Sequence, residues 1–292
     1  MDNLLGQSQG TNGEALAARR LFLIQNNELH SFAQKVVRDM KIVSWNIRHG
    51  GGKQSDSISD QLARWEPSIV CLSEFRGTKP SQEIATRLSE HGLGFQMTTV
   101  VKSRPVDNRL LVASEYPITR LECHGKLQEI GSWLHVEVDC EIPFRLAAMY
   151  VPNRGKPSHL KYQIHDEVIE MMKSEGDNAT IAMGDTNTGQ PDLDESAKFF
   201  NKHEARWFDR ISETGWIDAW RHRNPEKREY TWHTHTGSGF RLDQAFVTQK
   251  MNQRVTSIEY RWGRDAEDQC LSDHAAIMVE LDDCSQTGCE SP

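Results

Sequence analysis

Polar side chains that can hold a metal ion or move a proton recur where apolar, strand-like runs of the sequence end. These residues are Asn46, Glu74, Tyr150, Asn153, Asp185, Asn187 and Asp243, while Asp273 and His274 directly precede a further apolar run. A single aspartate after a strand is usually a turn former or a helix N-cap. A whole set of carboxylates, carboxamides and an imidazole is harder to explain in that way. Because clustered carboxylates repel one another unless a cation balances them, the pattern predicts a hard divalent metal ion with oxygen ligands.

The elements that must position these residues are mainly strands, which dominate the sequence from Met40 onward. Apolar runs predict strands at 41–46, 68–73, 95–101, 109–114, 132–139, 144–151, 179–184, 241–248, 254–262 and 275–281. Helical spacing predicts helices at 13–38, 56–65, 81–91, 158–174 and 194–214. Helices separate some consecutive strands but not others, so we expect a mixed α/β fold. Strands that share a sandwich can bring their polar ends to one rim.

The domain organisation follows from the distribution of Gly, Pro and Ser. No linker rich in these residues divides 40–283, which predicts one catalytic domain over that range. Residues 1–39 are expected to be an N-terminal extension, partly disordered and then helical, and 284–292 a polar tail. Since Met40 is followed by a strand-like run, two hypotheses stay open. Either the extension is an appended helix, or translation begins at Met40.

The composition indicates the cellular compartment and limits the classes of partner that the protein can bind. No window approaches the roughly 20 apolar residues of a membrane span, and the apolar run at 21–24 is too short for a secretory signal. The six cysteines form no CxxC pair, which favours a reducing cytoplasm without structural zinc. The net charge of −8 has the wrong sign for a nucleic-acid partner unless a basic face exists locally.

Seven stretches together resemble the endonuclease/exonuclease/phosphatase superfamily, and most closely its exonuclease III and apurinic/apyrimidinic endonuclease branch. In chain order they are KIVSWNIR, IVCLSEF, YVPNRG, GDTNTG, GWIDAWRHRNPEKREYTW, FRLDQAFV and LSDHAAI. The resemblance spans about 41–279. It implies a four-layer α/β sandwich of two packed mixed β-sheets flanked by helices. It also implies cleavage of phosphodiester bonds, assisted by Mg²⁺ or Mn²⁺. The leading hypothesis is a DNA substrate and a role in DNA repair, and the protein is expected to be a monomer.

The resemblance assigns metal and catalytic roles to individual residues. Glu74 would be the main metal ligand, with Asn46 steadying the water shell of the ion and Asp273 touching a second or moving metal ion. Catalysis would involve Asp185, Asn187, His274, Asp243 and Tyr150. Asp185 would orient or deprotonate the attacking water, and His274 would donate to the phosphate oxygens. The sequence leaves open which of these carboxylates acts as the general base.

Phosphate and sugar contacts are expected from the loops around the site. By resemblance, Asn153 and Tyr150 reach the phosphates, and Phe240 stands where relatives often place a tryptophan against an abasic sugar. The loops 48–53, 75–80, 101–109 and 152–161 carry one acid, Asp107. Their cations are Arg48, Lys53, Arg76, Lys79, Lys102, Arg104, Arg109, Arg154, Lys156 and Lys161. The negative charge would then lie elsewhere, for instance at Asp192, Asp194 and Glu195.

One departure from the pattern of the family leaves the substrate class open. Only seven residues, HTHTGSG, separate YTW from FRLD, where abasic-site enzymes of this branch carry a longer insert. This is compatible with 3′-exonuclease activity or with less selective nicking. Two alternatives remain: a phosphoesterase acting on a phospholipid, nucleotide or inositol phosphate, and a non-catalytic nucleic-acid-binding module. Trp216, Trp220 and Trp232 are expected in the core rather than in the site.

Overall fold

The computed structural model describes residues 39–153 and 159–282. Several sequence predictions therefore lie outside the described residues, namely the helix at 13–38, the tail at 284–292, and the phosphate-binding residues Arg154 and Lys156. None of the helices in the described part reaches the length and apolarity that a bilayer crossing requires.

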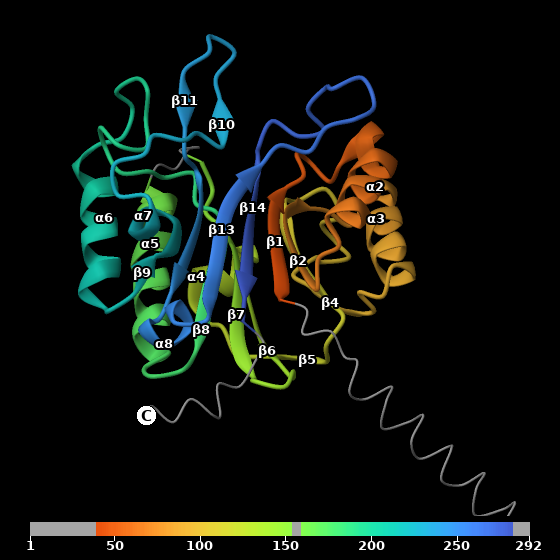
Figure 1. The fold of residues 1–292 in the computed structure, drawn as a ribbon, viewed down its shortest axis with the longest axis horizontal. Helices are drawn as coiled ribbons and strands as arrows, with labels where there is room; N and C mark the ends of the chain where they lie inside the picture. The colour runs from red at the N-terminus through yellow and green to blue at the C-terminus, as the bar shows by residue number, and fades with distance from the viewer. Residues whose placement is uncertain (1–38, 154–158, 283–292) are drawn as a thin grey trace, which may run out of the picture. The chain divides into compact units, whose positions relative to one another are not determined.

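Two six-stranded sheets face each other (Figure 1). The first sheet has the order β13-β14-β1-β2-β4-β3. Its strands are β1 (Met40–Asn46), β2 (Ile69–Phe75), β3 (Phe95–Thr98), β4 (Arg109–Ser114), β13 (Val255–Arg261) and β14 (Ala276–Leu281). β1 and β2 run parallel, and the other neighbours in this sheet run antiparallel. The carboxyl ends of β1 and β2, which carry Asn46 and Glu74, therefore meet at one edge of the sheet.

The second sheet repeats this arrangement with the order β5-β6-β7-β8-β12-β9. Its strands are β5 (Ile118–Arg120), β6 (Trp133–Val138), β7 (Phe144–Tyr150), β8 (Thr180–Asp185), β9 (Ile217–Asp218) and β12 (Asp243–Val247). β7 and β8 are its parallel pair, in a register that sets Tyr150 beside Asp185. The antiparallel pairing of β12 with β8 sets Asp243 beside Asp185. A small hairpin of β10 (Trp232–His233) and β11 (Gly239–Phe240) rises above this end.

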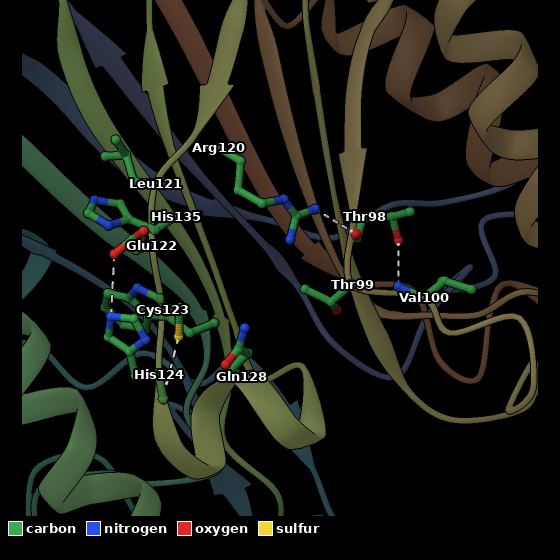
Figure 2. A pocket seen from close by; sticks show the side chains of 11 residues that line it. Thr98, Thr99, Val100, Arg120, Leu121, Glu122, Cys123, His124, Gln128 and His135 are labelled. Atoms are coloured by element: carbon green, nitrogen blue, oxygen red, sulfur yellow. Dashed lines mark hydrogen bonds and ion pairs between the residues drawn. The ribbon is translucent and has the colours of Figure 1, made fainter.

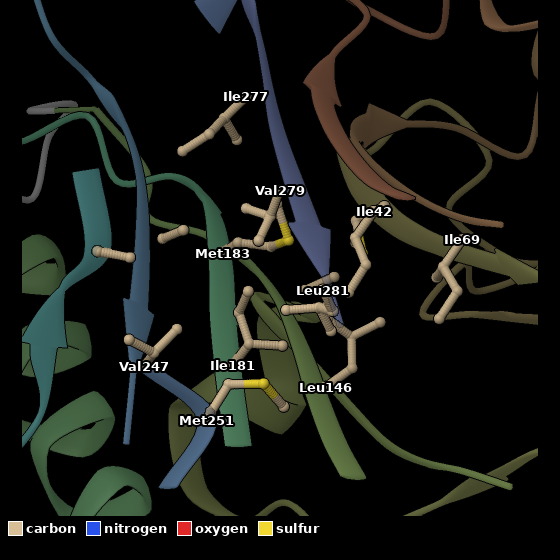
Figure 3. Close-up of a cluster of buried hydrophobic side chains, with 14 of the residues drawn as sticks. Ile42, Ile69, Leu146, Ile181, Met183, Val247, Met251, Ile277, Val279 and Leu281 are labelled. Carbon is tan, nitrogen blue, oxygen red and sulfur yellow. The ribbon is translucent and has the colours of Figure 1, made fainter. Parts of the chain in front are cut away.

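Apolar residues of both sheets fill the space between them and form the central core (Figure 3). The side-chain period of two sends alternate residues of each strand to opposite faces. In β1, Met40 and Ile42 point into the central core, whereas Val43 and Trp45 pack toward the helices. Because such strands are buried on both faces, they read as continuous apolar runs in the sequence.

Helices cover the outer face of each sheet, which completes the predicted four-layer sandwich (Figure 1). On the first sheet lie the 3₁₀ turn η1 (Gly52–Gln54), α2 (Ser55–Trp65) and α3 (Lys79–Glu90). On the second sheet lie α4 (Gly125–Ile130), α5 (His159–Ser174) and α6 (Lys202–Glu213). The short helices α7 (Ala219–Arg223) and α8 (Gln249–Asn252) flank β12.

The long helix predicted at 194–214 is wrong in its first half, because α6 begins only at Lys202. Asn201 caps α6 through a reciprocal capping box with Glu204. Ahead of the cap, the side chain of Glu195 accepts hydrogen bonds from the backbone N–H groups of Phe199 and Phe200. Such side-chain bonds compete with helical ones, so the segment between β8 and α6 folds as an irregular loop.

Candidate active site

A pocket of about 430 Å³ opens at the rim where the parallel strand pairs of the two sheets end. Its lining residues are His49, Glu74, Tyr150, Asn153, Asp185, Asn187, Phe199, Trp232, Thr234, Phe240, Leu242, Asp273 and His274. The polar strand ends singled out in the sequence are therefore largely brought to one place. Asn46 and Asp243 lie directly behind this lining, bonded to Asp185 and His274 respectively.

Asp185 lies at the centre of the hydrogen-bond network and is buried. Its Oδ2 accepts from Asn46 Nδ2 at 2.9 Å and from Asn187 Nδ2 at 3.1 Å, and its Oδ1 accepts from Asn187 N at 2.8 Å. Burial raises the pKa of Asp185 to about 7, with His274 opposing the rise and Asp243 adding to it. A carboxylate with a pKa near neutrality can exchange a proton with water at physiological pH.

His274 and Asp243 form a buried pair in which His274 Nδ1 lies 2.9 Å from Asp243 Oδ2. Burial alone would lower the pKa of His274, but the charges of Asp243 and Asp185 outweigh it and raise the pKa to about 10. At neutral pH the ring is therefore an imidazolium that donates from both nitrogens. Its Nε2 is 3.9 Å from Asp185 Oδ2, too long for a direct hydrogen bond, so both groups can face a third molecule.

Glu74 forms the opposite side of the pocket with Tyr150 and His49. Tyr150 donates its hydroxyl to Glu74 Oε1 at 3.2 Å, and the backbone N–H of His49 donates to Glu74 Oε2 at 2.7 Å. Burial, together with Glu74 and Asp185, raises the pKa of Tyr150, so its hydroxyl stays a donor. His49 was missed in the sequence, although it directly follows the matching stretch KIVSWNIR.

Left-handed backbone conformations concentrate at this site. Glu74 has φ 56°, Asn187 has φ 47°, and Arg48 and His49 have φ 50° and 53°. Non-glycine residues adopt this region at a cost of roughly 1–3 kcal/mol each, and such residues cluster at functional sites. At Glu74 the register between β2 and β4 also shifts. This irregularity interrupts the alternation of side chains between the two faces of β2 and re-aims the Glu74 side chain.

The phosphate-binding residues predicted from the sequence separate into groups. Asn153 and Phe240 line the pocket. Arg48 is exposed beside the site, where its backbone N–H donates to Asn46 Oδ1. Arg109 is only 2% exposed and pairs with Asp107 at 2.8 Å, so the direct phosphate contact expected of its guanidinium is not supported.

The prediction that Lys161 adds to a basic surface is wrong. Its ammonium is buried, where it donates to the backbone oxygen of Asn187 at 2.6 Å and pairs with Glu204 at 3.4 Å. Asp194 and Glu195 are likewise buried rather than surface acids. Asp194 accepts from Arg241 at 2.8 and 2.9 Å in a salt bridge that anchors the loop after β8.

Of the three tryptophans expected in the core, two are buried there and the third lines the pocket. Trp216 and Trp220 are buried in the core, as predicted. Trp232 instead lines the pocket, where its Nε1 donates to Asp273 Oδ2 at 3.3 Å. No local signal separated it from the other two, because the difference arises from its position on the β10–β11 hairpin.

Oxygen donors suited to a hard cation surround the pocket. Glu74 and Asp273 contribute carboxylates to the lining, and Asn46 contributes a carboxamide just behind it, a donor set that fits Mg²⁺ or Mn²⁺. Donor atoms of Asp185, Asp243 and His274 also lie within 4.8 Å of one another. The pocket therefore offers two neighbouring groups of residues that could hold a cation.

A second pocket, of about 540 Å³, lies beyond the ends of β3 and β5 (Figure 2). Its polar groups are largely engaged with one another. Arg120 donates to the backbone oxygen of Thr98 at 2.7 Å, and His124 lies 3.5 Å from Glu122. Burial raises the pKa of the Cys123 thiol to about 11, so the thiol is not activated. Despite its size, this pocket brings together no buried group of carboxylates and imidazole like the one around Asp185 among the described residues.

Two mixed sheets with helices on both outer faces, and a pocket of carboxylates, carboxamides and a buried histidine at their rim, define a phosphodiester hydrolase. The model of the Endonuclease/Exonuclease/phosphatase family matches residues 43–274. The chain belongs to this family, as the sequence resemblance predicts.

Curated relatives agree with this assignment. The chain is 24% identical over 276 residues to a "DNA-(apurinic or apyrimidinic site) endonuclease" of Dictyostelium discoideum, a match that covers 83% of this chain and 71% of that protein. It is 23% identical over 272 residues to "Exodeoxyribonuclease III" of Haemophilus influenzae, which covers 83% of this chain and all of that protein (100%).

Solved structures share the fold. An AP endonuclease from Archaeoglobus fulgidus superposes with a TM-score of 0.70 at 17% identity, covering 83% of this chain and 99% of that one. The 3′-5′ exonuclease NExo from Neisseria meningitidis gives a TM-score of 0.69 at 21% identity, covering 83% and 100%. A Neisseria NExo variant described as a 3′ phosphatase bound to product DNA hairpin gives 0.67 at 20%, covering 83% and 99%.

Proposed function

We propose that this protein is a divalent-metal-dependent nuclease that cleaves phosphodiester bonds of DNA by in-line attack of an activated water, in DNA repair. The observation that carries the proposal is the convergence of Asp185, the His274–Asp243 pair and Glu74 on one pocket. Relatives whose names describe cleavage at abasic sites and from DNA ends support a DNA substrate. The solved neighbour with a bound product hairpin supports the same substrate class.

In this proposal Glu74, Asn46 and Asp273 hold Mg²⁺ or Mn²⁺. The ion would supply Lewis-acid polarisation of the phosphate and lower the pKa of bound water. Tyr150 holds Glu74 by its hydroxyl hydrogen bond and, with Asn153, contacts the phosphates. The backbone N–H of His49 fixes the second oxygen of Glu74.

In this proposal, side chains of the protein accept the proton of the attacking water and stabilise the negative charge that develops on the phosphate. Asp185 orients the attacking water and accepts its proton, while Asn46 and Asn187 keep the carboxylate in place. His274 donates from Nε2 to a non-bridging phosphate oxygen as negative charge develops, and Asp243 keeps the ring protonated and correctly turned. Donors that are fixed before the reaction stabilise this charge without reorganisation.

The remaining contacts belong to the substrate backbone and sugar. Arg48, Arg154 and Lys156 supply cations for the phosphates of the strand. Phe240 provides an apolar wall for the sugar inside the pocket. We also propose, from the cysteine pattern, that the enzyme acts in the cytoplasm, and we expect it to be a monomer. Cell fractionation and size-exclusion chromatography of the full chain test these two statements.

An activity panel with the full chain tests the function. The substrates are a duplex with one abasic site, a duplex with a recessed 3′ end, and small phosphoesters including an inositol phosphate and a nucleotide, each with Mg²⁺ and with EDTA. We expect cleavage of DNA only when metal is present. Cleavage of the small esters alone would overturn the proposal in favour of a small-molecule phosphoesterase. Metal-independent DNA binding without cleavage would favour a binding module.

Variants locate the activity in the pocket. Asp185→Ala and His274→Ala are expected to abolish turnover while circular dichroism shows a folded protein. Asp139→Asn serves as the control, because Asp139 is exposed at the end of β6 and away from the pocket lining. Near-normal rates in either alanine variant would refute the role assigned to that residue.

A further inference from the structure

We infer that Phe199 determines substrate specificity by stacking on the base of an unpaired nucleotide held in the pocket. The enzyme would then prefer strand ends that retain their bases over abasic sites. This inference rests on the proposed nuclease function and deepens it by naming the substrate class.

The exposure of Phe199 is the first observation. Its side chain is 49% exposed although it is a large apolar residue. The other large hydrophobic residues exposed to this degree in the described part of the chain are Phe95, Val101 and Val106. Of these four residues, Phe199 alone lines the pocket that contains Asp185 and His274. An apolar ring left open at such a place is a typical ligand contact.

The backbone that carries this ring is held in place. Glu195 is buried, and its Oε2 accepts from Phe199 N at 2.6 Å and from Phe200 N at 2.7 Å. Glu195 also forms a β-bridge with Phe240 of the hairpin. The loop is therefore irregular but anchored, so little conformational entropy is lost when the ring binds a ligand.

Neighbouring rings connect Phe199 to the catalytic histidine. Phe199 packs edge-on against Phe200 and Phe240, with ring centroids 5.7 and 5.6 Å apart. Phe240 lies 6.0 Å from Trp232, which lies 6.5 Å from His274. These rings form one aromatic wall from the rim to His274. A nucleotide with its phosphate at His274 would lay its base along this wall.

Stacking on an aromatic side chain is worth roughly a 5- to 150-fold change in affinity per base, and it does not depend on base identity because every base has a π-face. An abasic sugar has no ring to stack and gains little from Phe199. The short connection between β10 and β11 leaves the loop after β8 to supply this contact. The favoured substrate is therefore an unpaired terminal nucleotide, as at a frayed recessed 3′ end.

Four variants of the full chain test the inference. Phe199→Ala removes the ring, Phe199→Leu keeps apolar bulk without a π-face, and Phe199→Trp keeps a stacking surface. The matched control is Phe95→Ala, since Phe95 is 47% exposed but lies on the edge strand β3, outside the pocket. Each variant is assayed for kcat/KM with a recessed duplex ending in a normal base and with the same duplex carrying a tetrahydrofuran abasic residue at that position.

We expect Phe199→Ala and Phe199→Leu to lose about tenfold on the base-bearing end and less than about twofold on the abasic one. Phe199→Trp and Phe95→Ala should stay close to the wild type on both substrates. Equal losses on the two substrates, or no loss with Phe199→Ala, would overturn the inference while the nuclease function stands.

Failure of the nuclease function itself gives a different result, in which the wild type cleaves neither duplex. Binding of a fluorescein-labelled single strand in EDTA then decides the inference. A roughly tenfold weaker affinity of Phe199→Ala than of the wild type would support stacking without catalysis. Equal affinities, or no binding by the wild type, would overturn both proposals.

Discussion

Replacing Asp243 by Asn removes the charge that keeps His274 protonated. Asp243 is buried, and its Oδ2 lies 2.9 Å from His274 Nδ1. Asparagine has nearly the same shape and can still accept a hydrogen bond, so the substitution changes charge more than packing. We expect the pKa of His274 to fall, because burial then acts against fewer opposing carboxylates.

The size of the effect follows from the pKa of His274. Burial lowers it, yet Asp243, Asp185 and Asp273 together raise it from 6.5 to about 10, which corresponds to roughly 5 kcal/mol of net interaction. Asp243 is the largest contributor to the rise. Losing it should cost on the order of 3 kcal/mol, the usual cost of breaking a buried ion pair. The pKa of His274 is higher in the folded protein than the ordinary value of 6.5 that it has in the unfolded chain. The pairing therefore stabilises the fold fully below pH 6.5, and this stabilisation is lost as pH rises through about 10.

Urea unfolding in metal-free buffer measures the effect. The free energy of unfolding is compared between wild type, Asp243→Asn and the control Asp139→Asn at about pH 6 and about pH 11. We expect Asp243→Asn to be destabilised by about 3 kcal/mol at the lower pH and by much less at the higher pH. Asp139→Asn should match the wild type at both. A deficit of the same size at both pH values would refute the imidazolium pairing.

Three further predictions concern the pocket and the loop beside it. Tyr150→Phe removes the hydroxyl that donates to Glu74, so kcat should fall about ten- to a hundredfold while the melting temperature changes little; a normal kcat would contradict this role. Glu74→Gln should raise the Mg²⁺ concentration needed for half-maximal cleavage at least about tenfold in a metal titration, and an unchanged requirement would move the metal site elsewhere. Asp194→Asn should lower the free energy of urea unfolding by about 3 kcal/mol, because it removes the buried carboxylate that Arg241 and Arg221 share and leaves Arg241 with Asp218; a loss under about 1 kcal/mol would contradict that account.

The positions of most strands could be predicted from the sequence because the signal is local. The run at 109–114 matches β4 at both ends, and the runs at 144–151 and 179–184 match β7 and β8 within one residue. Period-two burial and continuous apolar runs are properties of neighbouring residues, so they can be read without tertiary information. Short elements such as β5, α4 and β9 gave no signal, since a few residues are too few for a periodic pattern.

The sequence by itself determined which polar residues end the core strands, and so which side chains were available to a site. Tertiary structure decided which of them meet. Asn46 and Asp185 are bonded although 139 residues separate them, and Tyr150 reaches Glu74 across 76 residues. No local pattern encodes such pairings, because they depend on strand order and register.

Tertiary structure also decided the fate of residues whose type alone suggested a role. Lys161 lies in the interior, where the ammonium finds Asn187 O and Glu204, although the sequence suggested a surface cation. Glu74 takes a left-handed conformation that its neighbours in the chain do not require. Phe199 escaped notice because its segment has helical spacing, yet the hydrogen bond that its backbone N–H donates to Glu195 holds the segment as a loop at the pocket. Burial and electrostatics depend on partners distant in the chain, and only the folded arrangement of both sheets supplies those partners.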